Sequence, residues 1–210
     1  CSLAGMDLLM TLDYAWFSTM FGVYFFAGGF VSFFGALTLA TLALERAGRL
    51  AGVVTIEHYH DLGKLMFAFT FFWAYIAFSQ YLLYWYANIP EETIWFRVRQ
   101  THGWEALGLL LIFGAWLLPF AGLMSRFAKR RRAVLAFFAV WIAAMQWCNV
   151  YWVTMPVLSP QRVPASVLDL LCFVGLGGLW LAAATRAAAA DRLVPVGDPR
   201  LADSLTFENA

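Results

Sequence analysis

The sequence contains few charged residues and several long stretches that have none. Charged residues make up 13% of the 210 residues and hydrophobic residues 62%, whereas soluble domains average about 25% charged and roughly 45–50% apolar residues. Four intervals contain no charged residue, and they lie between positions 13 and 45, 64 and 91, 105 and 126, and 132 and 162. This pattern excludes a soluble domain with one core and favours a chain embedded in a lipid bilayer.

The sequence also lacks the usual signatures of catalysis and of metal or nucleic-acid binding. It has no P-loop, zinc-ligand spacing or nucleophile elbow, and its basic residues form no face with interleaved aromatic side chains. The cysteines, at positions 1, 148 and 172, show neither metal-ligand nor redox spacing. No pair among His58, His60 and His102 can bracket a haem inside the membrane, because all three fall at the edges of apolar stretches. We expect no catalytic residue, no metal site and no nucleic-acid partner.

Long apolar stretches predict an all-α, polytopic transmembrane helix bundle of about five spans. Roughly 20 residues of helix cross about 30 Å of hydrocarbon, and lipid offers the backbone no hydrogen-bond partner outside a helix. The expected spans are residues 21–44, 65–89, 104–123, 133–155 and 166–185. They form a membrane domain over residues 1–190, followed by a polar tail over residues 191–210. The apolar stretch from Ser2 to Leu12 is expected to be the end of a further helix in a longer membrane protein.

The distribution of Lys and Arg predicts the orientation. With five spans, 11 of these residues fall on one side of the membrane and 3 on the other. Cytoplasmic loops carry the excess of Lys and Arg, so the loops near 45–64 and 125–132 and the C-terminus are expected in the cytoplasm. Aromatic rings expected at the opposite boundary are Tyr14, Trp16, Tyr84, Trp85, Tyr86, Trp95, Trp104, Tyr151 and Trp152.

The densest polar cluster lies just before the second expected span. His58, His60, Asp61 and Lys64 would form a proton entrance there, because histidine titrates near neutral pH and carboxylates relay protons. The alternative role is helix capping, which suits Asp61 as an N-cap but accounts for neither histidine. The two histidines, two residues apart, would not share a helix face, which argues against a metal site.

A few polar residues lie within the expected spans. Gln80 is one, and Gln146 and Asn149 are two others that lie three residues apart on one face of the fourth span. Polar residues at this depth line water-filled paths or form hydrogen bonds between helices. For Gln146 and Asn149 the second role is favoured, because neither side chain ionises. Asp169 follows Ser166 by three residues, which is the spacing of a capping box.

Small residues four apart predict a packing face on the first span. They are Gly28, Ser32, Ala36 and Ala40. Small side chains let two helix backbones approach closely, so this face is expected to seat a neighbouring helix, either of this chain or of a partner.

Several long strings resemble one family of membrane proteins. They are LDYAWFSTMFGVY at 12–24, EHYHDLGKL at 57–65, FWAYIAFSQY at 72–81 and WYANIPEET at 85–93, with shorter pairs at 119–120, 125–126, 151–152 and 155–156. Together they resemble the second, ActF-type membrane subunit of bacterial alternative complex III, within the NrfD-like (polysulfide-reductase membrane subunit) superfamily. The resemblance covers about residues 6–160.

The resemblance implies a role in a quinol-oxidising respiratory complex. The chain would be the C-terminal half of an NrfD-like fold, anchoring the complex and contributing to proton conduction or a quinone pocket. Haem c and iron–sulfur clusters would belong to partner subunits in the membrane and at its surface. The family tends to have His at position 115, His at 146 and Asp at 149, where this chain has Ala115, Gln146 and Asn149.

Two other roles remain open from the residues alone. A stand-alone transporter or ion channel would need ionisable or broken-helix sites near the midplane, and the four uncharged stretches hold none. A purely structural membrane anchor needs no such site.

Overall fold

The computed structural model describes residues 1–164, 166–190 and 192–208, and these residues form helices and loops without a strand. Five helical stretches are long and apolar enough to span a membrane. They are α2 (Phe21–Arg46), α3 (Ile56–Ala87), the continuous stretch α5–η2–α6 (Trp104–Leu110, Leu111–Leu117 and Leu118–Met124), α8 (Arg132–Leu158) and α9 (Val167–Ala190). The predicted all-α, five-span architecture is therefore confirmed.

Short helices complete the chain at its ends and between spans. They are α1 (Ser2–Leu8), the 3-10 turn η1 (Met10–Leu12), α4 (Pro90–Val98), α7 (Arg126–Arg130) and α10 (Leu201–Leu205). Pro90 opens α4, a position where its missing N–H costs nothing and its fixed φ favours the helix.

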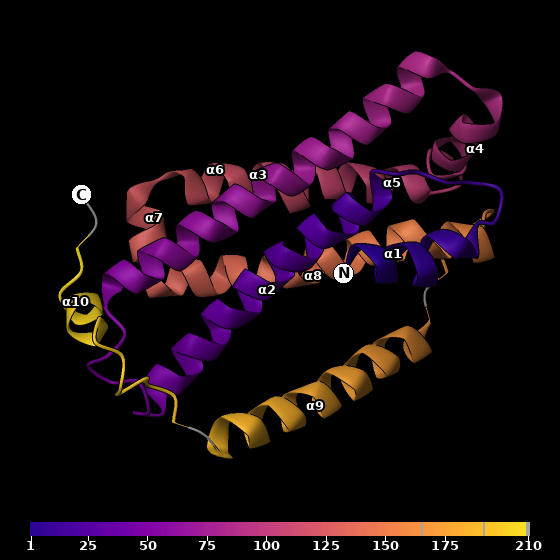
Figure 1. Ribbon diagram of the computed structural model, residues 1–210. Coiled ribbons are helices and arrows are strands. Elements are labelled where there is room, and N and C mark those ends of the chain that lie inside the picture. Colours follow the sequence, from indigo (N-terminus) through magenta and orange to yellow (C-terminus); the bar gives the residue numbers. More distant parts are fainter. Residues whose placement is uncertain (165, 191, 209–210) are drawn as a thin grey trace.

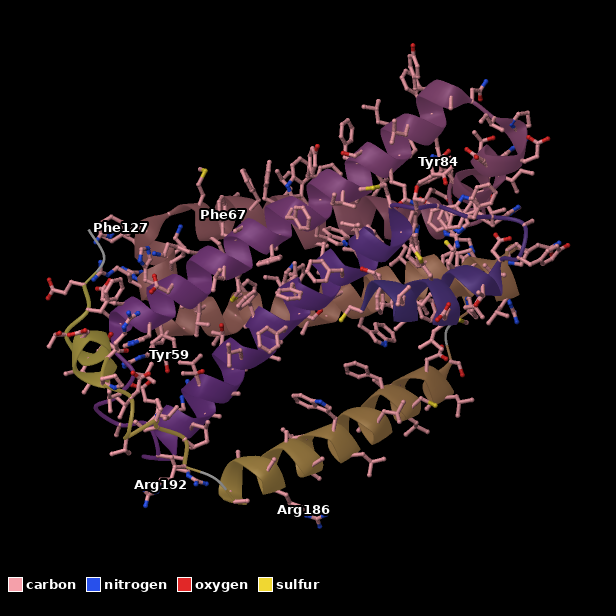
Figure 2. All side chains as sticks on the ribbon, in the orientation of Figure 1. Tyr59, Phe67, Tyr84, Phe127, Arg186 and Arg192 are labelled. Atoms are coloured by element: carbon pink, nitrogen blue, oxygen red, sulfur yellow. The ribbon has the colours of Figure 1, made fainter. Side chains whose placement is uncertain are left out.

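The spanning helices run lengthwise, and their connections fall at two ends (Figure 1). One end, called the basic end below, holds residues 47–55, α7 and α10. The other end, called the aromatic end, holds α4 and residues 159–164. Arg186 and Arg192 lie toward the basic end (Figure 2). The cationic connections therefore gather on one side of the bundle, as the alternation of five spans requires.

Helix α2 lies at the centre of the core and packs against both α3 and α8. A Cβ atom placed on Gly35 of α2 would lie 3.2 Å from the backbone oxygen of Ala139 in α8, so the two backbones approach closely there. The buried row of α2 includes Gly28, Val31, Gly35 and Thr38.

Within this chain, only part of the predicted packing face on α2 contacts a neighbouring helix. Gly28 is buried, but Ala36 and Ala40 are exposed. An α-helix has 3.6 residues per turn, so a row of residues spaced by four rotates about 40° per step away from the starting face. Alternating steps of three and four, as in the observed row, stay on one face.

Helix α3 is longer than the other helices, and α9 has few contacts with the rest of the bundle. α3 has 32 residues, which at 1.5 Å per residue gives about 48 Å, longer than the hydrocarbon core. It begins at Ile56, so the predicted entrance cluster lies in its first turns rather than before the helix. α9 runs along one side of the bundle (Figure 1) and has no buried residue among those described. Its Phe173 ring lies 6.0 Å from that of Trp147 in α8.

Candidate functional site

A cavity of about 770 Å³ lies at the aromatic end between α3, α4, α5–η2 and α8. Part of its wall consists of exposed apolar side chains, including Phe71, Phe78 and Ile112. Other wall residues, including Gln80 and Arg99, are buried. The cavity therefore opens between exposed apolar side chains and also borders a few buried polar residues.

Arg99, the C-cap residue of α4, is a buried cation of this wall. Its side chain is buried, with the residue only 2% exposed, and the guanidinium carbon lies 3.5 Å from the ring centroid of Trp95. Its nitrogens donate three hydrogen bonds to backbone oxygens: Nη1 to Trp95 at 2.7 Å, Nε to Trp152 at 3.1 Å and Nη2 to Val153 at 2.5 Å. Arg99 therefore fastens α4 to α8.

Pro156 explains why α8 accepts this guanidinium. In an α-helix, the N–H of each residue bonds to the oxygen four residues earlier, and proline has no N–H. Pro156 lies inside α8, so the oxygen of Trp152 has no helical donor. Nε of Arg99 supplies the missing hydrogen bond.

Backbone oxygens and the Trp95 ring stabilise the positive charge of Arg99, and among the described residues no carboxylate lies within ion-pair distance of it. Burial lowers the pKa of Arg99 to about 9, and the nearby charge of Asp13 opposes this shift. A buried charge needs such compensation, and a ligand atom that accepts hydrogen bonds would add to it.

Three tryptophans of the cavity wall have buried indole N–H groups. Nε1 of Trp116 and of Trp152 has no hydrogen-bond partner within the described part of the chain, whereas the indole of Trp73 interacts with the hydroxyl of Tyr24. Indole can only donate. Trp116 belongs to η2, a π-helical turn, and such turns are frequent at functional sites.

Two of the predicted intramembrane residues form a polar triad with Tyr24. The hydroxyl of Tyr24 in α2 donates to Oδ1 of Asn149, and Nδ2 of Asn149 donates to Oε1 of Gln146 at 3.2 Å. The triad thus links α2 to α8, as expected for hydrogen bonds between helices. Gln80 lies in the wall shared by the large cavity and a neighbouring cavity of about 340 Å³.

The predicted role of Asp61 as an N-cap is wrong. Thr55 is the N-cap of α3, and a capping box joins it to His58, whose Nδ1 accepts from the backbone N–H of Thr55 at 3.0 Å. Capping therefore accounts for His58, which the sequence analysis did not expect. Asp61 lies in the second turn and pairs with Lys64 at 2.6 Å. The N-cap is Thr55 because α3 begins at Ile56, five residues before Asp61. The backbone N–H groups that need a cap lie in that first turn.

His60 faces the opposite way from His58, as the two-residue spacing predicted. The residue is 6% exposed, and its Nδ1 has no partner among the described residues. The charged groups that act on His60 are Lys64, Lys129, Arg126 and Asp61. Two further carboxylates of this end of the bundle form ion pairs, Glu57 with Arg130 and Glu45 with Arg132 at 2.7 Å.

Tyr59 also lies at the basic end and contacts one of these carboxylates. Figure 2 shows it at the opposite end of α3 from Tyr84. Its hydroxyl donates to Glu45 at 2.8 Å. The threonines between this region and the polar triad are Thr38 and Thr70, and both donate to oxygens of their own helices. A proton path from His60 toward Tyr24 along these residues would therefore need bound water.

Near the start of α9, Oγ of Ser166 accepts a hydrogen bond from the N–H of Leu168 at 3.1 Å. Asp169 lies in the first turn of that helix, where a carboxylate favours the helix dipole. Both observations agree with a capping role. In the described ranges, no group of three or more His, Cys, Asp or Glu side chains has the geometry to hold a metal ion.

Comparison with known proteins leaves the sequence resemblance without independent support: no protein-family model matches this chain, and no curated protein does. The sequence analysis missed Arg99 and Tyr24 as members of the site. Pro156 signals that an oxygen in α8 needs a donor, but it does not indicate that the donor comes from Arg99.

Proposed function

We propose that this chain is an integral membrane subunit of a quinol-oxidising electron-transfer complex, and that its large cavity binds a molecule of the quinone class. The cavity carries the proposal. Its wall combines exposed apolar side chains with the buried Arg99. Ligand pockets are mostly apolar with a few placed polar groups, and 770 Å³ lies in the usual range for them.

A quinone suits both parts of this cavity. Its tail and ring are apolar and reach the site from the bilayer, and its carbonyl oxygens accept hydrogen bonds. Aromatic wall residues such as Tyr75, Trp116 and Phe78 offer faces against which a ring can stack.

A subunit role, rather than a stand-alone one, rests on the family resemblance and on α9. This helix has 24 residues and buries none of those described, which leaves its surface available to lipid or to partner subunits. The partners implied by the resemblance would carry haem c and iron–sulfur clusters. The proposed location is a bacterial inner membrane, with the basic end and the C-terminus on the cytoplasmic side.

A contribution to proton conduction belongs to the same proposal. Of the predicted entrance residues, His60 is buried, and its Nδ1 has no partner in the part of the chain that the structure describes. It lies at the basic end, where protons would enter from the cytoplasm under the proposed orientation.

Filling the cavity tests the binding of a quinone. Ala77 lines the cavity, whereas Ala68, nine residues earlier on the same helix, is exposed and lies outside it. Ala77→Trp should lower the affinity for a decyl-substituted benzoquinone at least about tenfold, and the matched control Ala68→Trp should leave it unchanged. Equilibrium dialysis of nanodisc-embedded protein against empty nanodiscs measures both. Equal affinity in the two variants, or no binding by the unaltered chain, would reject the quinone site.

Purification in mild detergent separates the proposed role from the alternatives. Haem and iron–sulfur absorbance that co-purifies with the chain would support the complex. A haem-free single chain that drives uptake into vesicles would support a transporter. A chain that holds redox subunits but binds no quinone would be a structural anchor.

A further inference from the structure

We infer that the basic end carries a binding site for an anionic phospholipid, and that Lys64 of α3 and Arg126 of α7 contact its phosphate. This site lies outside the large cavity and is independent of the ligand of that cavity. Three properties of the surface support it: its net charge, the depth of its cations and the apolar side chains beside them.

Positive charge is in excess where α3 packs against α7. Three cations lie near enough to act on His60 through their charges, and they are Lys64, Arg126 and Lys129. Asp61, which pairs with Lys64 at 2.6 Å, is the carboxylate in the same set. Three positive charges and one negative charge leave this group with a net charge of +2.

The next carboxylates along this end of the bundle do not remove the excess. Glu57 forms an ion pair with Arg130. Glu45 forms another with Arg132 at 2.7 Å. Each of these carboxylates is therefore matched by a further cation of the same turn, and the exposed Arg131 lies between the two arginines in sequence.

Lys129 holds one of the positive charges at a buried position. The residue is 8% exposed, and its Nζ donates to the oxygen of Met124 at 3.3 Å and lies 5.2 Å from the ring centroid of Phe67. Burial and the like charge of Lys64 lower the pKa of Lys129. An anion bound nearby would favour the charged form of this group.

Lys64 and Arg126 lie at the depth expected for lipid headgroups. Lys64 directly precedes the apolar stretch expected to span the membrane from residue 65, and Arg126 follows the stretch expected to end at residue 123. Both residues are exposed. Lys and Arg near the ends of spanning helices place their charged groups at the membrane interface.

Exposed apolar side chains flank the two cations. They are Leu65 beside Lys64, and Met124 and Phe127 near Arg126. Figure 2 shows Phe127 at the basic end. A phospholipid has an anionic phosphate directly above apolar acyl chains, so it matches both the cations and these side chains, whereas a free phosphate ion matches only the cations. Basic pockets between spanning helices are known to bind anionic headgroups.

A comparison of two lipids tests the site on the unaltered chain. The full chain in detergent is titrated with dioleoyl phosphatidylglycerol or with dioleoyl phosphatidylcholine, and native mass spectrometry measures the bound fraction. We expect phosphatidylglycerol to bind at least about fivefold more tightly, which is the gain from one cation near an anionic headgroup. Equal affinities, or tighter binding of phosphatidylcholine, would overturn the site.

Inorganic phosphate distinguishes a lipid from a free anion as the ligand. We expect it to displace bound phosphatidylglycerol no better than chloride at the same ionic strength, because neither ion has acyl chains. Stronger displacement by phosphate would identify a site for free phosphate and overturn the lipid assignment.

Substitutions test which cations set the preference. Lys64→Gln combined with Arg126→Gln should lower the preference for phosphatidylglycerol at least about fivefold. The matched control, Arg97→Gln with Arg162→Gln, removes two exposed cations from the aromatic end and should leave the preference unchanged.

A charge-conserving variant separates loss of charge from loss of fold. Lys64→Arg with Arg126→Lys should keep the preference, and thermal unfolding of each variant checks that the bundle is intact. A preference that survives the double Gln substitution, or that falls equally in the aromatic-end control, would overturn the assigned contacts.

Discussion

At the scale of single residues, Arg99 combines two roles that usually belong to different side chains. It satisfies backbone oxygens at the ends of two helices, and it places a buried positive charge beside a cavity. The stacking of its guanidinium on Trp95 adds cation–π attraction at a buried position. A lysine at this position would keep the charge but lose the planar fork that reaches three oxygens at once.

Removing Arg99 should therefore cost stability in a way that depends on Pro156. We expect Arg99→Met to destabilise the bundle by about 2–4 kcal/mol, because buried oxygens lose their donors. In the Pro156→Ala background the cost should be smaller, since the substituted alanine supplies an N–H to the oxygen of Trp152. Thermal unfolding in detergent measures each variant and the double variant. The exposed Arg97 provides the control Arg97→Met, which should change little. Additive costs in the double variant would contradict the assigned hydrogen bond.

His60 gives a second prediction at this scale, about proton transfer. His60→Ala should lower proton uptake or quinol turnover of the assembled complex, because it removes the buried titratable group at the basic end. Asp61→Ala is the companion variant, and we expect a smaller effect because Asp61 is paired with Lys64 at a more exposed position. Unchanged turnover and unchanged proton stoichiometry in His60→Ala would rule out the relay role.

At the scale of helices, glycine decides how closely α2 approaches α8. Gly35 faces the backbone of Ala139, where a neighbour cannot move aside as a flexible side chain could. Gly29, on the same helix, has no atom within 4 Å of the position its Cβ would occupy. Both positions have helical backbone, so they differ only in their surroundings.

These surroundings predict different effects of the same substitution. Gly35→Val should force α2 and α8 apart and destabilise the protein by about 1–3 kcal/mol. Gly29→Val should leave the stability within about 0.5 kcal/mol, as is usual for surface substitutions. Thermal unfolding in detergent, followed by size-exclusion chromatography, compares the two. Equal stability of the two variants would contradict the α2–α8 contact.

At the scale of the whole molecule, the proposed orientation assigns the two ends to opposite sides of the membrane. Phe127 at the basic end and Tyr86 toward the other end of α3 are both exposed. In a chain whose own cysteines are replaced by serine, Tyr86→Cys should react with a membrane-impermeant maleimide added to intact cells. Phe127→Cys should react only after the cells are permeabilised. Labelling of Phe127→Cys in intact cells would reverse the orientation.

Sequence patterns predicted the helices better than the contacts between them. The boundary aromatics show the difference: Tyr14, Trp85 and Tyr86 are exposed as a membrane belt requires, but Trp16 and Trp95 are buried. These two rings stack with centroids 4.5 Å apart and belong to the core of the aromatic end. Hydropathy assigns such residues to a boundary depth, but it does not state whether they face lipid or protein.

The five membrane-spanning helices follow from the sequence by itself. An uncharged stretch of about 20 residues has one low-energy form in lipid, because only a helix satisfies its backbone hydrogen bonds locally. The cavity and its unpaired cation were decided only by the tertiary structure. Arg99 reaches its partners in α8 across 53 and 54 positions of sequence. A contact of that range depends on how the helices pack, which no local pattern of residues encodes.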